Sequence, residues 1–222
     1  MTVGYDGALL DQVVTPDGQI SFGYDQLARR TTMTDCTGPT RWTWDPTHPD
    51  LVASIAAPHG TVSYGYDRLG RRRSLTGPDT ALGYQYDPTG ALSTFTVQGD
   101  AGTSFGYDAN GMLVRIERPN GVVSSFGYDG DLRLNSISHT APGAVNEQFG
   151  YTLDANGNRT AVTSNAGVER YALDELNRLA QVTYPDGQAA AYTYDAAGNR
   201  RTETGTGSPT VTWAYDQYGQ LT

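Results

Sequence analysis

One two-residue motif limits the possible folds of this chain more than any other property. An aromatic residue or leucine followed by aspartate recurs along the whole sequence. The motif aspartates are Asp6, Asp25, Asp45, Asp67, Asp87, Asp108, Asp129, Asp154, Asp174, Asp195 and Asp216. Their spacing is nearly constant, and the two widest gaps precede Asp67 and Asp154. A binding site needs one copy, whereas many evenly spaced copies are typical of a structural repeat. The sequence therefore predicts a single array of about eleven 21-residue units over residues 1–222.

Each unit opens with two aromatic residues separated by one residue and followed by the aspartate. Alternation with a period of two is a strand signal, and it places both rings on one face of the strand. The intervening residue is mostly small, as at Gly23 and Gly65, which predicts a close approach on the opposite face. The residues predicted to define the repeat are Tyr24, Asp25, Tyr66, Asp67, Gly70, Tyr86, Asp87, Gly90, Tyr107, Asp108, Gly111, Tyr128, Asp129, Asp154, Gly157, Asp174, Tyr194, Asp195, Gly198, Tyr215 and Asp216.

Two turns punctuate each unit. The first has Asp at its first position and Gly at its fourth, the preference of a type I turn. The second is a Pro-Asp-Gly or Pro-Asn-Gly hairpin turn, as at residues 16–18, 119–121 and 185–187. Two strands per unit give an all-β antiparallel sheet of about twenty strands, each of roughly five to seven residues, with helix nearly absent. The helix-like stretch 171–176 lies in repeat register and is therefore predicted to be strand and turn.

Two longer spacings interrupt the regular repeat. They fall around residues 45–50 and 136–148, and both are predicted to be lengthened loops that protrude from the sheet.

Twenty strands at about 4.8 Å spacing form a ribbon on the order of 95 Å long, which is unlikely to stay flat. The ribbon can wind into a spiral wall, close into a barrel or break into four-stranded blades. Blades would make odd and even units differ, and we see no such difference in the sequence, so the spiral wall is favoured. Both chain ends fall within the array without a polar cap. We therefore expect the chain to be part of something longer, or to associate edge to edge.

Composition excludes several functional classes. The formal net charge is −9, which leaves no overall basic footprint for a nucleic acid. No apolar run approaches the length of a transmembrane helix, so no membrane span is predicted. Segment 1–14 lacks the basic and apolar regions of a signal peptide, so export would need a larger parent chain or a dedicated export system. Cys36 is the only cysteine, which excludes an internal disulfide.

No catalytic, cofactor-binding or metal-binding residues are predicted, and the chain is not expected to be an enzyme. Residues 154–158 resemble the start of a calcium loop, but its sixth and twelfth positions are Arg159 and Asn165 instead of Gly and Glu. Cys36 has no nucleophile signature around it. The abundant aspartates are explained by turns rather than by acid–base pairs. The three histidines have no ligand spacing and are predicted to be surface or loop residues; they are His48, His59 and His139.

The basic residues carry a further signal, since all 15 are arginine. Most of them follow a motif aspartate by four to six positions: Arg29, Arg30, Arg71, Arg72, Arg73, Arg133, Arg159, Arg178, Arg200 and Arg201. They form either a solvated strand face or a ladder in which Arg stacks on a Tyr of the neighbouring unit or pairs with its Asp. If the ladder sets strand register, Tyr107→Ala should lower the melting temperature more than Phe105→Ala does. Equal losses would contradict the ladder.

The unit, written YDxxGR-L-x-x-V-x-x-PDG-x-x-x-Y-x-Y-D, resembles the YD repeat of the Rhs family along essentially the whole chain. Members include bacterial Rhs polymorphic toxins, the B and C components of Tc toxins, and teneurins. The resemblance implies a sheet that spirals into a hollow shell, or cocoon, around a C-terminal toxin. This chain would then be a structural encapsulation element, secreted or delivered as part of a larger protein. Its partners would be the remainder of the shell or the enclosed toxin.

The chain departs from the family where the shell is closed. No PxxxxDPxG-type segment follows the last repeat, and residues 87–90 are an ordinary repeat turn. We therefore expect no separate toxin or core domain, and neither self-cleavage nor toxicity is implied. Two alternatives stay open. The aromatic rows could bind glycans at a cell surface by stacking, or the array could be a fragment that self-assembles through its open edges.

Overall fold

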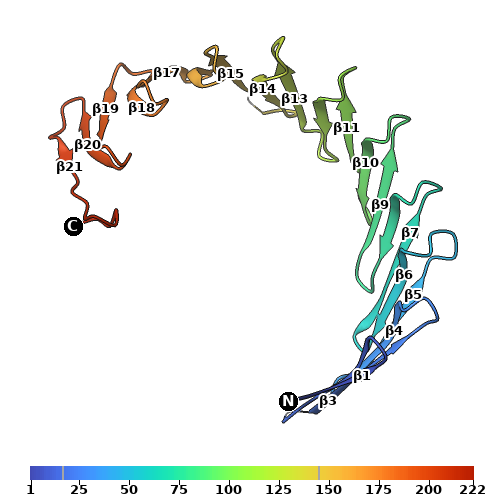
Figure 1. Cartoon of the computed structure of the whole chain (residues 1–222). Helices are drawn as coiled ribbons and strands as arrows, with labels where there is room; N and C mark the ends of the chain where they lie inside the picture. Colours follow the sequence, from blue (N-terminus) through green and yellow to red (C-terminus); the bar gives the residue numbers. More distant parts are fainter. Residues whose placement is uncertain (17, 145) are drawn as a thin grey trace. The chain divides into compact units, whose positions relative to one another are not determined.

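A computed structural model describes residues 1–16, 18–144 and 146–222, and within them it contains twenty-one strands and no helix (Figure 1). The strands are β1 (Thr2–Asp6), β2 (Leu9–Thr15), β3 (Gly18–Tyr24), β4 (Arg30–Asp35), β5 (Gly38–Trp44), β6 (Val52–Ala57), β7 (Gly60–Tyr66), β8 (Arg72–Thr76), β9 (Ala81–Tyr86), β10 (Leu92–Val97), β11 (Thr103–Tyr107), β12 (Leu113–Glu117), β13 (Val123–Tyr128), β14 (Leu134–Thr140), β15 (Glu147–Leu153), β16 (Arg159–Ser164), β17 (Gly167–Leu173), β18 (Leu179–Thr183), β19 (Ala189–Tyr194), β20 (Arg200–Gly205) and β21 (Val211–Thr212). The all-β prediction is confirmed, and with it the strand and turn expected over residues 171–176.

The chain divides into two compact units, residues 1–104 (unit 1) and 105–222 (unit 2). Within unit 1 each strand pairs antiparallel with the next along the chain, without a break from β1 to β10. The same holds in unit 2 from β12 to β21. Ten strands paired in succession are not divided into four-stranded blades. Among the described strands β1 pairs with β2 alone, so unit 1 does not close into a barrel. Each unit is an open meander.

The pairing sorts residue types onto two faces. On one face, the first aromatic of most motifs pairs with an apolar residue, as Tyr64 does with Leu75 and Tyr84 with Phe95, whereas Tyr192 pairs with Glu203. On the other, small and hydroxylated residues pair, as Ser54 does with Ser63 and Gly65 with Ser74. An added Cβ at Gly65 would lie 2.5 Å from the Ser74 hydroxyl oxygen, so the predicted close approach is found.

The sheet is a single layer with hardly any core. Its accessible surface is 14467 Å², against about 9,900 Å² for a compact globular chain of this mass. Among the described residues, those that are buried are Ser124, Ala161, Val182 and Ala190, and of these Ser124 alone is fully buried. Most strand residues on both faces are half-buried by their neighbours within the layer. Stability must therefore come from contacts between adjacent repeats rather than from a second packed layer. Within the described residues, no helix has the length and apolar character needed to span a membrane.

The two irregular spacings have different outcomes. Asp45–Leu51 connects β5 to β6 without strand structure, so a loop is found where one was predicted. The loop predicted over 136–148 is wrong in extent, because residues 136–140 belong to β14 and 147–148 to β15. Ser138 pairs with Gln148 and His139 with Glu147, so most of the additional residues lengthen the hairpin. The connection is 141–146, of which Val145 lies outside the described residues.

Each repeat also has a hairpin turn at the end of the strands opposite the Asp-x-x-Gly turn. These hairpin turns stack on one another between successive repeats. The Pro of one turn packs against the Gly of the preceding repeat's turn, where a Cβ would crowd the ring. This occurs for Pro58 on Gly38, Pro78 on Gly60, Pro142 on Gly121 and Pro185 on Gly167. All four glycines have φ between +79° and +138°, a region that disfavours other residues. The Pro and Gly of the repeat thus form an inter-repeat contact as well as a turn.

Candidate functional site: the YD turn and its inter-repeat contacts

The motif aspartate closes its turn with its own side chain. Asp67 Oδ1 accepts hydrogen bonds from the backbone N–H groups of Leu69 at 2.9 Å and Arg71 at 3.0 Å. The backbone of Asp67 also accepts from Gly70 N at 3.0 Å. The same pair of side-chain bonds is made by Asp25, Asp87, Asp108, Asp129, Asp154, Asp174, Asp195 and Asp216. The recurring aspartate is therefore a turn residue, as predicted, and its carboxylate is occupied.

These bonds hold the aspartates in their ionised form. The Arg29 guanidinium, bonded to Asp25, lowers the pKa of that carboxyl below its usual value. At Asp174 the backbone N–H of Arg178 is the main cause of a lowered pKa. The pKa of the motif carboxyls Asp45, Asp67, Asp87, Asp129, Asp154 and Asp195 is lowered as well. Each of these turns therefore depends on its own ionised aspartate, and all of them are sensitive to protonation in the same way.

We expect the array to unfold in acid. A carboxyl whose folded pKa lies below its unfolded value of about 3.9 contributes stability above that value, and the contribution is lost as pH falls through the folded pKa. The urea midpoint should therefore be level above about pH 5 and fall steeply below about pH 4. Urea titrations followed by tryptophan fluorescence would check this. A midpoint unchanged down to pH 3 would contradict it.

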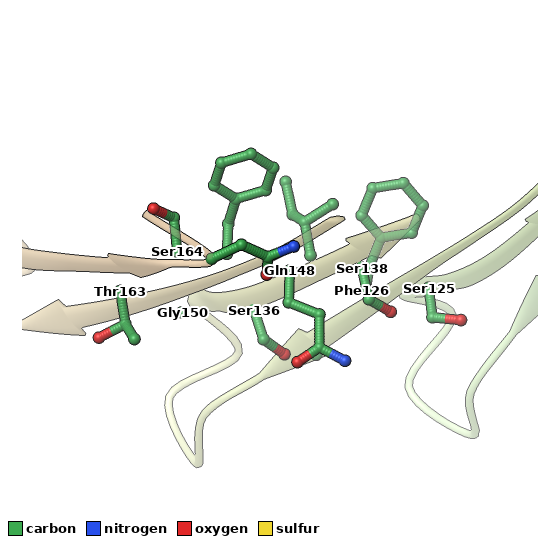
Figure 2. Close-up of a pocket in the computed structure, with 12 residues that line it drawn as sticks. Ser125, Phe126, Ser136, Ser138, Gln148, Gly150, Thr163 and Ser164 are labelled. Atoms are coloured by element: carbon green, nitrogen blue, oxygen red, sulfur yellow. The ribbon is translucent and has the colours of Figure 1, made fainter. Parts of the chain in front are cut away.

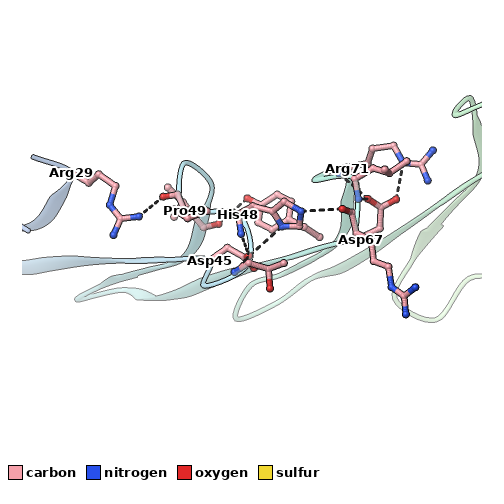
Figure 3. A network of polar contacts seen from close by, with 11 residues as sticks. Arg29, Asp45, His48, Pro49, Asp67 and Arg71 are labelled. Atoms are coloured by element: carbon pink, nitrogen blue, oxygen red, sulfur yellow. Dashed lines mark hydrogen bonds and ion pairs between the residues drawn. The ribbon is translucent and has the colours of Figure 1, made fainter. Parts of the chain in front are cut away.

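An arginine four residues after the aspartate connects the turn to the next repeat. Arg71 Nε donates to Asp67 Oδ2 at 2.7 Å, and the guanidinium carbon lies 4.4 Å from the centre of the Tyr86 ring (Figure 3 shows the Arg71–Asp67 contact). Three other turns have the same ion pair: Asp25–Arg29, Asp129–Arg133 and Asp174–Arg178. Arg29 lies over Trp44 and Arg178 over Tyr194. Arg29, Arg71 and Arg178 therefore each join their own turn to an aromatic ring of the following repeat.

Variation among the turns follows the same logic. Where the next repeat has Leu153 instead of an aromatic residue, Arg133 NH1 donates to the Asp154 carbonyl at 3.2 Å. Asn158 and Asn199 take the arginine position in two other turns, and each donates its amide to the Oδ2 of the turn aspartate at 3.0 Å. A second row of arginines lies over the first aromatic of the motif: Arg30 over Phe22, Arg72 over Tyr64, Arg159 over Tyr151 and Arg200 over Tyr192. The contacts of the Arg–Tyr–Asp ladder are present, while its role in setting register stays a prediction.

The tyrosine of the motif makes a contact that the sequence reasoning missed. Tyr66 Oη donates to the Val52 carbonyl of the preceding repeat at 2.8 Å. The same bond is made by Tyr24, Tyr86, Tyr128, Tyr194 and Tyr215, at 2.8–3.0 Å. Trp44 Nε1 replaces the hydroxyl and donates to Arg30 O at 3.1 Å. A signal existed, because the second aromatic is always Tyr or Trp, whereas the first is Phe in three units.

Arginine in the fourth position after Asp occurs in every second turn from Asp25 to Asp67 and from Asp129 to Asp174. The four turns with Arg in the fourth position after Asp also carry a leucine at their apex: Leu27, Leu69 and Leu176 follow the Asp by two positions, and Leu132 follows it by three. The other turns from Asp45 to Asp216 carry, two positions after the Asp, Thr47, Thr89, Asn110, Asn156, Ala197 and Tyr218. Strand pairing does not alternate in this way, and the successive turns of Asp195 and Asp216 both lack the arginine, so no odd–even pattern runs through the chain.

His48 takes the place of the arginine in the lengthened loop (Figure 3). Its Nδ1 lies 3.3 Å from Asp45 Oδ1 and its Nε2 lies 3.4 Å from the Arg68 carbonyl in the next repeat. Its ring centre is 6.4 Å from that of Tyr66. Arg29 NH1 also donates to the Pro49 carbonyl. This histidine is a loop residue, as predicted, and it connects adjacent repeats as arginine does elsewhere.

The remaining candidates for chemistry are structural. His59 and Cys36 lie exposed in turns. His139 is instead half-buried in β14, where its Nδ1 lies 2.8 Å from the buried Ser124 hydroxyl, so the surface prediction was wrong for it. Asp154 of the calcium-loop candidate bonds to Asn156 and Asn158, which leaves it a turn. Among the described residues, no three His, Cys, Asp or Glu side chains gather in a way that would hold a metal ion.

A hollow of about 500 Å³ lies over β13–β16 of unit 2 (Figure 2). Its polar lining includes Ser136, Gln148 and Thr163, and these side chains point away from the face that carries the Phe126 ring. The lining is entirely uncharged: Ser125, Phe126, Gly127, Ser136, Ile137, Ser138, Gln148, Phe149, Gly150, Thr163, Ser164 and Asn165. Hydroxyl and amide groups can form hydrogen bonds there, but they offer no acid or base for catalysis.

Comparisons with known proteins agree with this architecture. The family described as RHS Repeat matches residues 107–145, 154–189 and 174–210. The crystal structure of TcdB2-TccC3 is similar over 97% of this chain, with 18% identity and a TM-score of 0.67. TcdB2-TccC3 without its hypervariable C-terminal region is similar over 96%, with 15% identity and a TM-score of 0.61. A Photorhabdus luminescens Tc holotoxin pore matches over 96%, with 14% identity and a TM-score of 0.57.

The low sequence identity of these matches and the small part of each matched chain that they cover limit what can be concluded from them. At these identities the likeness is one of fold, and this chain spans 15%, 16% and 18% of those three chains. No curated protein sequence matches the chain. The repeated YD turn, the antiparallel meander and the RHS Repeat match over residues 107–145 and 154–210 together support an Rhs/YD-repeat family for this chain.

Proposed function

We propose that this chain is a segment of an Rhs-type shell wall that encloses a cargo, such as a toxin domain, for secretion or delivery. The observation that carries the proposal is a single-layer sheet whose repeats are joined side to side. Tyr66 Oη to Val52 O and Arg71 over Tyr86 are examples of these joints. A sheet stabilised in this way needs no packed second layer, so one face is free to line an interior while the other meets solvent.

The wall has no catalytic task in this proposal. Its motif carboxylates are held in turns, and the hollow over β13–β16 has an uncharged lining. The chemistry of cargo and release would belong to other parts of a larger protein. Delivery would likewise depend on an export system acting on that protein.

Limited proteolysis of the protein expressed from its complete native gene would test the proposal. Wild-type protein should yield a cargo fragment that resists protease while the wall is folded. A variant with both Tyr66→Ala and Tyr194→Ala should release the fragment to digestion. A native product that consists of the repeat array alone, or one whose cargo is cut equally fast in both forms, would overturn the proposal.

The glycan-binding alternative has less support. Sugars stack on open aromatic faces, but guanidinium groups lie over the rings of Tyr64, Tyr86, Tyr151, Tyr192 and Tyr194. At the hollow, the Ser136, Gln148 and Thr163 side chains point away from the face that carries the Phe126 ring, which separates these hydrogen-bonding groups from that ring (Figure 2).

We therefore expect no binding on a glycan array. A glycan that binds with a Kd below about 100 μM, and that is lost on Tyr86→Ala, would restore the alternative. Arg71→Ala serves as the matched comparison, because it uncovers the Tyr86 ring and should strengthen any true stacking.

A further inference from the structure

The apices of the YD turns carry a row of exposed leucines. Leu27 is 67% exposed, Leu69 77% and Leu176 71%, and Leu132 is 46% exposed. Among the described residues, the only other exposed leucine is Leu221. Single exposed leucines are common on protein surfaces, but four of these five lie in YD turns, three of them two positions after the Asp and Leu132 three positions after it, so they are not scattered.

These apices lie along one edge of the sheet in each unit. In an antiparallel meander every YD turn joins the first strand of a repeat to the second, so all of them fall at the same end of the strands. Leu27 and Leu69 in unit 1 are two repeats apart, as are Leu132 and Leu176 in unit 2. Two repeats are four strands, or roughly 19 Å. Between them lie the smaller or more polar apices Thr47 in unit 1 and Asn156 in unit 2.

The charges around the leucine turns have opposite signs in the two units. In unit 1, residues 25–31 hold one aspartate and two arginines, and residues 67–73 hold one aspartate and four arginines. In unit 2, residues 129–135 and 174–180 each hold two acidic residues and one arginine. The leucine turns of unit 1 are therefore basic, and those of unit 2 are acidic. Opposite charge at equal leucine spacing favours contact between the two kinds of edge.

We propose that the YD-turn edge is a docking surface for a second copy of this repeat array. The basic leucine turns of unit 1 in one copy lie against the acidic leucine turns of unit 2 in the other. Each leucine sits over a smaller apex of the partner, because both rows repeat every two turns. This surface is distinct from the open strand edges β1 and β21, and it holds whether or not the wall encloses a cargo.

Sedimentation velocity of the full chain over a wide concentration range tests the surface. Reducing buffer is needed, since Cys36 is exposed and could link copies covalently. Wild-type chain should self-associate, more strongly at low salt than at high salt. Leu69→Ser and Leu176→Ser should each weaken association about tenfold or more, since each removes one apolar contact. Leu221→Ser, which changes an exposed leucine outside these turns, should leave it unchanged.

A charge swap gives a second readout that does not depend on the leucines. Arg68 and Glu175 are exposed residues at a unit 1 apex and a unit 2 apex. Arg68→Glu alone and Glu175→Arg alone should each weaken association, and the double variant should restore it. A wild-type chain that stays monomeric, equal weakening by Leu221→Ser, or a double variant that adds the two losses would each overturn the proposal. Association that survives all of these changes would assign it to the strand edges instead.

Discussion

Replacing Gly60 with alanine is expected to destabilise unit 1 by about 2–4 kcal/mol. Gly60 has a φ of +138°, where a side chain is strained, and an added Cβ would collide with the ring of Pro78 in the next repeat. The backbone of β7 begins at this residue, so the collision cannot be relieved by a side-chain rotation alone. Urea unfolding, with the free energy taken from the linear extrapolation, measures the loss.

Two variants separate the causes. Gly18→Ala adds a methyl group at a glycine with a φ of +142°, also at the start of a strand of unit 1, but with no atom within 4 Å of the new Cβ, so it reports backbone strain alone. Gly60→Ala with Pro78→Ala removes the ring and should recover part of the loss. If Gly18→Ala and Gly60→Ala cost the same, the inter-repeat contact between Pro and Gly contributes nothing.

Replacing Tyr66 with alanine is the second large effect, at about 3 kcal/mol. The change removes a half-buried ring and the hydroxyl bond to Val52 O. Tyr66→Phe keeps the ring and should cost about 1 kcal/mol, the net value of one hydrogen bond. The same urea titrations give both values, and their difference is the contribution of the ring.

Tyr64 provides the matched control, because it is the first aromatic of the same motif and lies under Arg72. Tyr64→Phe keeps the ring beneath the guanidinium and should cost less than Tyr66→Phe. A larger loss at Tyr64 would show that the hydroxyl at the second position is not the part of the repeat that joins adjacent units.

Much of this protein's structure depends on residues that are close in sequence, and it could therefore be predicted from the sequence. The spacing of the aspartates indicated the number of repeats, and Asp67 with Gly70 indicated a turn, because a turn uses only neighbouring residues. The two aromatics at a period of two identified a strand and its faces. The loop predicted around residues 45–50 is also confirmed, because it too depends on a short stretch of neighbouring residues. The hairpin of β14 and β15 was not predicted, because the wide gap between two motif aspartates does not say how many of the intervening residues pair.

Strand pairing decided what joins one repeat to the next. Between Gly65 and Tyr66 the register against β8 shifts, and similar shifts precede most motif aspartates. The bulge lies where the Tyr66 hydroxyl bonds to a carbonyl of the preceding repeat, and Arg71 just beyond it lies over a ring of the following repeat. Residue spacing does not contain that register. The local sequence pattern therefore determines the repeat, its turns and its strands. Which atoms are in contact between successive repeats depends instead on how the folded strands are aligned.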